Sequence, residues 1–169
     1  MKNPYRYNKG YLMLPVEIEG LAKGLSFAGH SLVLKTSFHV SLLCIKNLPS
    51  TQGQAIEKKI LNLLDLYLEN HSISFSGFTG EIREVKDEKD GRYSLVAMVH
   101  VRGLKEFFDL LRKDMFLEVD DQPTHITLYT LGLNKGIGVN NAKTFNALTC
   151  EVYGLEIVMI KKILDMQTI

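Results

Sequence analysis

The stretch Ile73–Val101, ISFSGFTGEIREVKDEKDGRYSLVAMVHV, decides our interpretation of the fold. An Asp-Gly pair at 90–91 supplies a tight turn between two strand-like runs, so the stretch predicts a β-hairpin with a charged tip. Gly77 and Gly80 interrupt the first run and predict a bulge or bend there. The second run, Tyr93–Val101, is almost continuously apolar, which indicates a central strand covered on both faces.

Helical patterns lie on both sides of this hairpin. Apolar residues recur at helical spacing in Thr51–Glu69, where Thr51 and Gln54 also fit a capping box, and in Leu104–Met115. Further strands are predicted at Ser31–Ile45, Thr124–Leu131 and Cys150–Leu164. Because hairpins and helices mix in this order, we expect an α+β fold with mainly antiparallel sheets rather than a doubly wound parallel fold.

The composition is that of an ordinary globular protein. The 169 residues suit one domain, 1–169, and the formal net charge of +1 is far from that of a general duplex-DNA binder. No apolar run approaches the roughly 18 residues of a membrane-spanning helix, and no signal-peptide pattern is evident. Cys44 and Cys150 have no metal-ligand spacing and are interpreted as two buried free thiols. We therefore expect a monomeric cytoplasmic protein that binds neither duplex DNA nor membranes.

Two short motifs of the same form carry the chemistry. The sequence FHVSL surrounds His39 and the sequence THITL surrounds His125, so each reads histidine, apolar, hydroxyl, apolar. Because side chains alternate between the faces of a strand, His39 shares a face with Ser41, and His125 shares a face with Thr127. Each predicted strand therefore presents an imidazole beside a hydroxyl, with apolar residues on the opposite face.

Such a pair suits cleavage of a phosphodiester. The reaction needs a base to deprotonate the attacking oxygen and an acid to protonate the leaving oxygen, and two histidines can fill both roles near neutral pH. The hydroxyls of Ser41 and Thr127 would bond the non-bridging phosphate oxygens as charge develops on them. This chemistry requires no metal and no cofactor.

The paired motifs, with this order of elements, resemble the 2H phosphoesterase superfamily, which includes RNA 2′,3′-cyclic phosphodiesterases and 2′-5′ RNA ligase-like proteins. The resemblance implies a bilobal, pseudo-twofold α+β fold with outer helices and a central cleft. It implies that His39 and His125 are the acid–base pair and that Ser41 and Thr127 bind phosphate. Two positions depart from the family pattern: Ser41 replaces the more usual threonine, and Thr130 stands about where several members carry an arginine.

Four other features are candidates for the same site. Lys35 precedes the first motif on the same predicted strand face, and Lys135 lies in the Gly-rich loop Gly132–Gly138 after the second motif. Both lysines are candidate phosphate ligands, with solvated surface charge as the alternative. Tyr129 is predicted to share the face of the second motif and to stack on a base, with a core position as the alternative. Tyr5–Tyr11 mixes aromatic and basic residues and is interpreted as an edge strand or a frayed terminus rather than a nucleotide surface.

The leading hypothesis is a metal-independent phosphoesterase that acts on a nucleotide or RNA terminus bearing a cyclic 2′,3′ or a 2′-5′ phosphodiester. We assign His125 as the base and His39 as the acid, and these roles exchange in the ligating direction. Two alternatives stay open: a non-catalytic nucleotide- or RNA-end-binding module on the same scaffold, and a structural protein whose motifs are coincidental.

Overall fold

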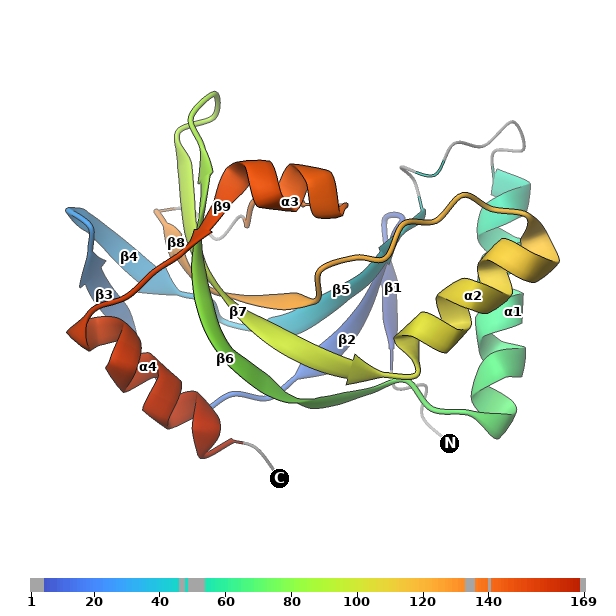
Figure 1. The fold of residues 1–169 in the computed structure, drawn as a ribbon, viewed down its shortest axis with the longest axis horizontal. Helices are drawn as coiled ribbons and strands as arrows, with labels where there is room; N and C mark the ends of the chain where they lie inside the picture. Colours follow the sequence, from blue (N-terminus) through green and yellow to red (C-terminus); the bar gives the residue numbers. More distant parts are fainter. Residues whose placement is uncertain (1–4, 46–47, 49–53, 133–135, 140, 168–169) are drawn as a thin grey trace.

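The computed structural model describes residues 5–45, 48, 54–132, 136–139 and 141–167, which form an α+β structure (Figure 1). Its elements, in chain order, are β1 (Arg6–Asn8), β2 (Tyr11–Val16), β3 (Gly24–Phe27), β4 (His30–Leu34), β5 (Phe38–Cys44), α1 (Gln54–Asn70), β6 (Ser74–Asp87), β7 (Arg92–Arg102), α2 (Leu104–Met115), β8 (His125–Leu131), α3 (Ala142–Leu148), β9 (Thr149–Glu151) and α4 (Leu155–Asp165). The strands of this part of the chain form one sheet with the order β1-β2-β5-β8-β7-β6-β9, in which β4 also pairs with β8 and β3 pairs with β4. The antiparallel α+β prediction is confirmed.

The predicted hairpin is formed by β6 and β7, which pair antiparallel from Ser74 opposite Arg102 to Asp87 opposite Arg92. The register of β6 shifts at two places, beside Gly77 and again between Phe78 and Ile82, as the two glycines predict. β7 pairs with β6 on one side and β8 on the other, so the prediction of a central strand is also confirmed.

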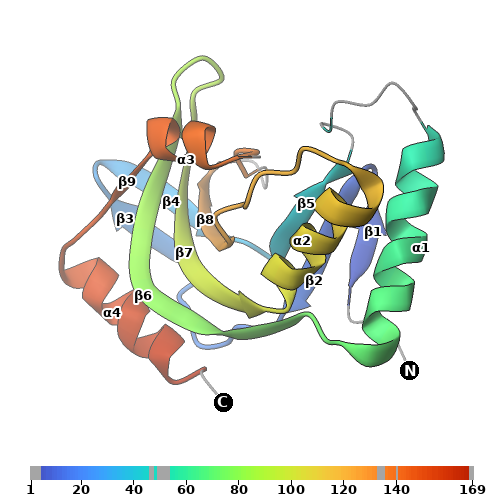
Figure 2. The same cartoon turned by 45° about the vertical axis from the view of Figure 1, so that its right-hand side comes forward.

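The main core joins the sheet to three helices. Buried apolar residues of β2, β5, β7 and β8 pack with the inner faces of α1, α2 and α4. Figures 1 and 2 show α1 and α2 side by side at one end of the sheet and α4 at the other end. The sheet between these helix groups carries the candidate site.

A smaller second core covers part of the other face of the sheet. It consists of Val85, Val96, Ile137, Val139 and Phe145. Val96 alternates along β7 with main-core residues on either side of it, so the second core lies on the face opposite the main core. It attaches α3 and the segment 136–139 to this face.

The segment Ser31–Ile45 is two strands instead of the one that we predict. The strand is interrupted between Leu34 and Phe38, so that β4 pairs with β3 and the end of β8, and β5 pairs with β2 and the start of β8. The intervening residues, Lys35-Thr36-Ser37, are polar and allow the chain to change partners. The alternation of polar and apolar residues along a strand does not reveal that the strand changes its pairing partner.

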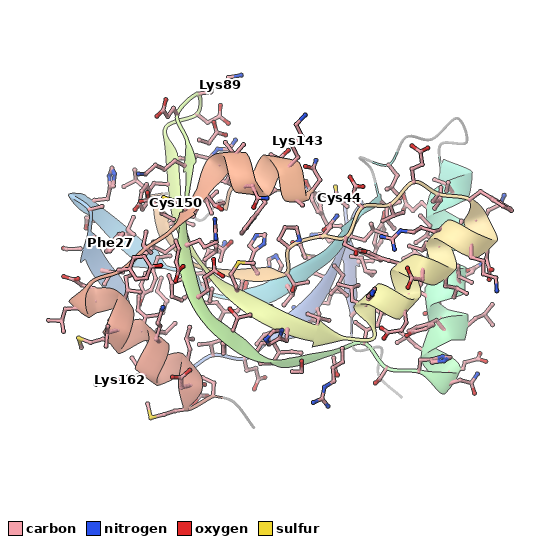
Figure 3. All side chains as sticks on the ribbon, viewed as in Figure 1. Phe27, Cys44, Lys89, Lys143, Cys150 and Lys162 are labelled. Carbon is pink, nitrogen blue, oxygen red and sulfur yellow. The ribbon has the colours of Figure 1, made fainter. Side chains whose placement is uncertain are left out.

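The prediction of a strand over Cys150–Leu164 is wrong beyond Glu151. Gly154, at φ 132°, separates β9 from helix α4. The buried residues Ile157, Ile160 and Leu164 follow helical spacing, which the β-branched composition of this segment conceals. Cys150 is exposed rather than buried, because β9 is a short edge strand, whereas Cys44 is buried as predicted (Figure 3).

The other predicted segments agree with the structure in part. Helix α2 has the predicted bounds, and α1 runs over Gln54–Asn70. Thr51 of the predicted capping box lies outside the described residues. Part of Tyr5–Tyr11 forms the edge strand β1, which favours the structural interpretation of that stretch. Helix α3 is absent from our predictions.

Candidate active site

The two motif strands meet at one residue pair. Val40 of β5 lies opposite Ile126 of β8 in the antiparallel register, and both side chains are fully buried in the main core. The neighbours of this pair must therefore point to the other face of the sheet. That face carries both motif histidines and both motif hydroxyls.

The register relates the two motifs by a local twofold axis. In an antiparallel pair, residues at equal offsets from the central pair are exchanged by a rotation of 180° about an axis perpendicular to the sheet. The rotation that exchanges Val40 and Ile126 therefore also exchanges His39 with His125 and Ser41 with Thr127. Each histidine lies across from the hydroxyl residue of the other motif.

All four of these side chains line a single cavity of about 330 Å³. Lys35 and Arg92 add two basic side chains to its wall, and residues 136–139 form another part of it. None of the described residues that line the cavity carries a carboxylate. The cavity is therefore suited to an anionic ligand of small-molecule size.

The imidazole of His125 is held in one orientation. Its Nδ1–H donates to the carbonyl oxygen of Pro123 at 2.9 Å, which leaves Nε2 without a proton in the neutral ring. Burial lowers the pKa of His125, and the bond to Pro123 opposes this shift only in part. The neutral form, with a lone pair on Nε2, is thus favoured at neutral pH.

The pKa of His39 is also lowered, mainly by burial and then by the positive charge of Lys35, with a smaller contribution from His125. The pKa of Lys35 is itself lowered by burial. Bound phosphate would offset both effects, because a negative charge near an imidazole favours its protonated form. The site can therefore take up a proton together with an anionic ligand.

Helix α3 supports the His125 ring from the side. The ring of Phe145 lies with its centroid 5.4 Å from that of His125, and the Arg83 guanidinium lies 5.3 Å from the centre of the Phe145 ring. The helix begins at Asn141, whose Oδ1 accepts the backbone N–H of Thr144 at 2.8 Å. The position of His125 therefore depends on an element well separated from it in sequence.

The Gly-rich segment after β8 approaches the Thr127 hydroxyl closely. A Cβ on Gly136 would lie 3.3 Å from Thr127 Oγ1, so only a residue without a side chain fits without displacing it. Lys135, the predicted phosphate ligand in this segment, lies outside the described residues. Lys35, by contrast, lines the cavity, although it lies between β4 and β5 and not on one strand with His39 as predicted.

The prediction that Tyr129 shares the face of Thr127 is wrong. Tyr129 is only 1% exposed, packs in the main core, and donates its hydroxyl proton to the Ala22 carbonyl at 3.0 Å. The register with β7 shifts between Thr127 and Tyr129, so Leu128 is an extra residue and the alternation changes phase there. A buried ring with a satisfied hydroxyl is not available to stack on a base.

Several cavity-lining residues are not among the predicted site residues, and Arg92, Ser37 and Gln122 are examples. Arg92 belongs to the charged tip of the predicted hairpin, where its sequence neighbours indicate only a solvated turn. Its position on the strand face of Val96 becomes visible once the β7–β8 register is known.

Within the described residues, no group of three or more His, Cys, Asp and Glu side chains could hold a metal ion, and no helix is long and apolar enough to cross a membrane. Comparison of the chain with protein-family models, curated proteins and solved structures found no match. The geometry of the cavity is therefore the feature that indicates a function.

Proposed function

We propose that this protein is a phosphoesterase of the 2H type, which hydrolyses a cyclic 2′,3′ or a 2′-5′ nucleotide phosphodiester by acid–base catalysis between His39 and His125. One observation carries the proposal. The pairing of Val40 with Ile126 puts two imidazoles and two hydroxyls on one wall of a cavity whose described lining contains no carboxylate. This combination provides proton transfer and anion binding at one place.

In the hydrolysis of a 2′,3′-cyclic phosphate, Nε2 of His125 removes a proton from water as the water oxygen attacks phosphorus. The bond between phosphorus and one ribose oxygen breaks, and protonated His39 gives its proton to that oxygen. Ser41 and Thr127 donate hydrogen bonds to the non-bridging oxygens, and Lys35 adds positive charge nearby. Both proton transfers are made by the protein, so this mechanism needs no metal.

The bilobal, pseudo-twofold arrangement belongs to this proposal. The local twofold relation of the two motifs supports it, as does the presence of helices at both ends of the sheet (Figures 1 and 2). In this view β5 and β8 are equivalent strands of the two lobes, and the cavity is the cleft between them. Cytoplasmic location and a monomeric state remain part of the same proposal.

The decisive test is turnover of 2′,3′-cyclic mononucleotides and a 2′-5′-linked dinucleotide in the presence of a chelator. We expect turnover by the wild type, and a loss of about 10²–10⁴-fold in each of His39→Ala and His125→Ala. His100→Ala removes an exposed histidine of β7 and serves as the matched control, with activity unchanged. Retained activity when both motif histidines are alanine would contradict the proposal.

A non-catalytic nucleotide-binding module is the alternative function. The lowered pKa of both histidines favours this alternative, because it disfavours the imidazolium form that an acid catalyst needs. A binding module would keep its affinity for nucleoside 3′-phosphates in His39→Ala and would release no product from any substrate. Turnover by the wild type that depends on both histidines excludes this alternative.

A further inference from the structure

Arg92 lines the cavity at a place far along the sheet from the motif hydroxyls. On β7, Val96 pairs with Thr127, and Arg92 lies four residues before Val96 on the same strand face. At about 3.3 Å per residue, its backbone is about 13 Å along the strand from that of Val96. The backbone of Arg92 therefore meets the cavity at a different place from that of Thr127.

The guanidinium is held at the cavity wall from behind. Its Nη2 forms ion pairs with Asp90 and with Asp87, the latter at 3.6 Å, and neither aspartate lines the cavity. A guanidinium has five N–H donors in a planar fork, so these two contacts through one nitrogen leave donors for a phosphate. The hairpin tip thus orients Arg92 without placing a carboxylate in the cavity.

Lys35 lies at the same end of the cavity, closer to the histidines. Its backbone N–H bonds the carbonyl of Leu128 at 2.8 Å, beyond Thr127 in the direction in which β8 runs toward Arg92. Its charge lowers the pKa of His39, so the ammonium group is near that ring. Lys35 therefore adds positive charge to this end of the cavity, while Asp87 and Asp90 balance the charge of Arg92.

The opposite end of the cavity differs in character. Its described lining residues include Tyr11, Met13, Cys44 and Gln122, which are uncharged. Tyr11 pairs with Cys44 in the β2–β5 register, and Ser41 and His125 lie toward this side of the central pair. A nucleobase suits this end, and an anionic group suits the end with Lys35 and Arg92.

We propose that Arg92, together with Lys35, binds a second phosphate of the substrate, so that the enzyme acts on nucleotides with another phosphate one ribose away from the scissile one. This inference rests on the proposed function and narrows its substrate class. The second phosphate is either a terminal 5′-phosphate or the next internucleotide linkage, which share the same charge and oxygen geometry. A cavity of about 330 Å³ is large enough for a ligand of small-molecule size.

Turnover of three substrates tests the subsite: a nucleoside 2′,3′-cyclic phosphate, the same compound with a 5′-phosphate, and a dinucleotide ending in a 2′,3′-cyclic phosphate. We expect kcat/KM to be about 10–100-fold higher for at least one compound with a second phosphate, because charge-assisted bonds to a guanidinium have this magnitude. The compound with the larger increase in kcat/KM identifies the source of the second phosphate. Equal kcat/KM for all three would overturn the inference.

Variants assign the preference to Arg92. In Arg92→Gln the advantage of the second phosphate should fall to less than about threefold, while Arg92→Lys should keep part of it, since a lysine retains the charge but not the fork. Lys162→Met removes one cation from α4 that lies well away from Cys44 in Figure 3 and does not line the cavity, so this variant should keep the full preference. An unchanged preference in Arg92→Gln contradicts the assignment.

Binding to a protein without catalysis separates this inference from the proposed function. In His125→Ala, calorimetry with a nucleoside 3′-phosphate and the corresponding 3′,5′-bisphosphate should show at least about tenfold tighter binding of the bisphosphate. If that ratio holds but the wild type turns over nothing, the phosphoesterase proposal fails and the subsite stands. If the wild type is active but the ratio is close to one, the subsite fails and the phosphoesterase proposal stands.

Discussion

At the scale of single residues, the two histidines are identical in type but differ in their surroundings. His125 is fixed by the Pro123 carbonyl, whereas His39 is under the influence of the Lys35 charge. Different surroundings can assign different roles to like groups, and the contact with Pro123 fixes the tautomer of His125. This difference supports His125 as the base and His39 as the acid.

The charge of Lys35 has a measurable consequence. In Lys35→Met the pKa of His39 should rise, because a positive charge that disfavours the imidazolium is gone while the side-chain length is kept. A titration of the histidine ring signals by NMR measures the change. Lys162→Met is the control and should leave His39 unaffected; an unchanged or lower pKa in Lys35→Met would contradict the assigned contact.

The pH dependence of catalysis follows from the direction of both shifts. A base acts when unprotonated and an acid when protonated, so lowering both pKa values moves both limbs of the kcat/KM profile to lower pH. We expect a bell-shaped kcat/KM profile with its maximum below about pH 6.5. The alkaline limb of kcat should lie at higher pH, because bound phosphate favours protonated His39. A kcat/KM maximum above pH 8 is the contradicting result.

At the scale of elements, helix α3 acts on catalysis through Phe145. Phe145→Leu should lower kcat about tenfold with little change in KM, because the His125 ring loses the aromatic surface that positions it. Phe108→Leu makes the same change at a buried ring of α2 and is the matched control. Both variants should lose about 1–2 kcal/mol of stability, but only Phe145→Leu should lower kcat.

The start of α2 depends on one glycine. Gly103 has φ 76°, and a Cβ there would lie 2.0 Å from the Ser72 carbonyl oxygen. Gly103→Ala should therefore destabilise the protein by about 2–3 kcal/mol in urea unfolding. Gly91 also has a positive φ, but a Cβ there would meet no other atom. Gly91→Ala therefore measures the backbone strain alone and should lower the free energy of unfolding by about 1–2 kcal/mol. Equal losses in the two variants would show that the Ser72 contact is unimportant.

At the scale of the whole molecule, sequence patterns predict the features that depend on residues close together in the sequence. The β6–β7 hairpin and helix α2 follow from a turn dipeptide and a helical period, and the faces of the two motifs follow from strand alternation. The phase change at Leu128, the exchange of strand partners after Leu34 and the place of Arg92 depend on register between strands distant in sequence. Alternation within one strand contains no information about that register.

Ligand binding should stabilise the molecule as a whole, because the cavity wall is formed by strands from both halves of the chain. At 100 times its Kd, a ligand that binds only the folded state adds about 2.7 kcal/mol to the free energy of unfolding. Nucleoside 3′-phosphate should therefore raise Tm in the wild type and raise it less in the variant with alanine at Ser41 and Thr127. An equal rise in both proteins would place the phosphate elsewhere.

The pairing of Val40 with Ile126 also determines where the chain tolerates a change in length. One residue inserted between His39 and Ser41 would turn one of the two side chains into the core. A residue inserted beside the exposed Lys89 lengthens the turn before Asp90 and keeps the spacing between Asp90 and Arg92. A library of single-residue insertions, selected for activity, should therefore be depleted at 39–41 and 125–127 and populated beside Lys89. The residue spacing within the two motifs is therefore fixed, whereas the exposed turn beside Lys89 can change in length.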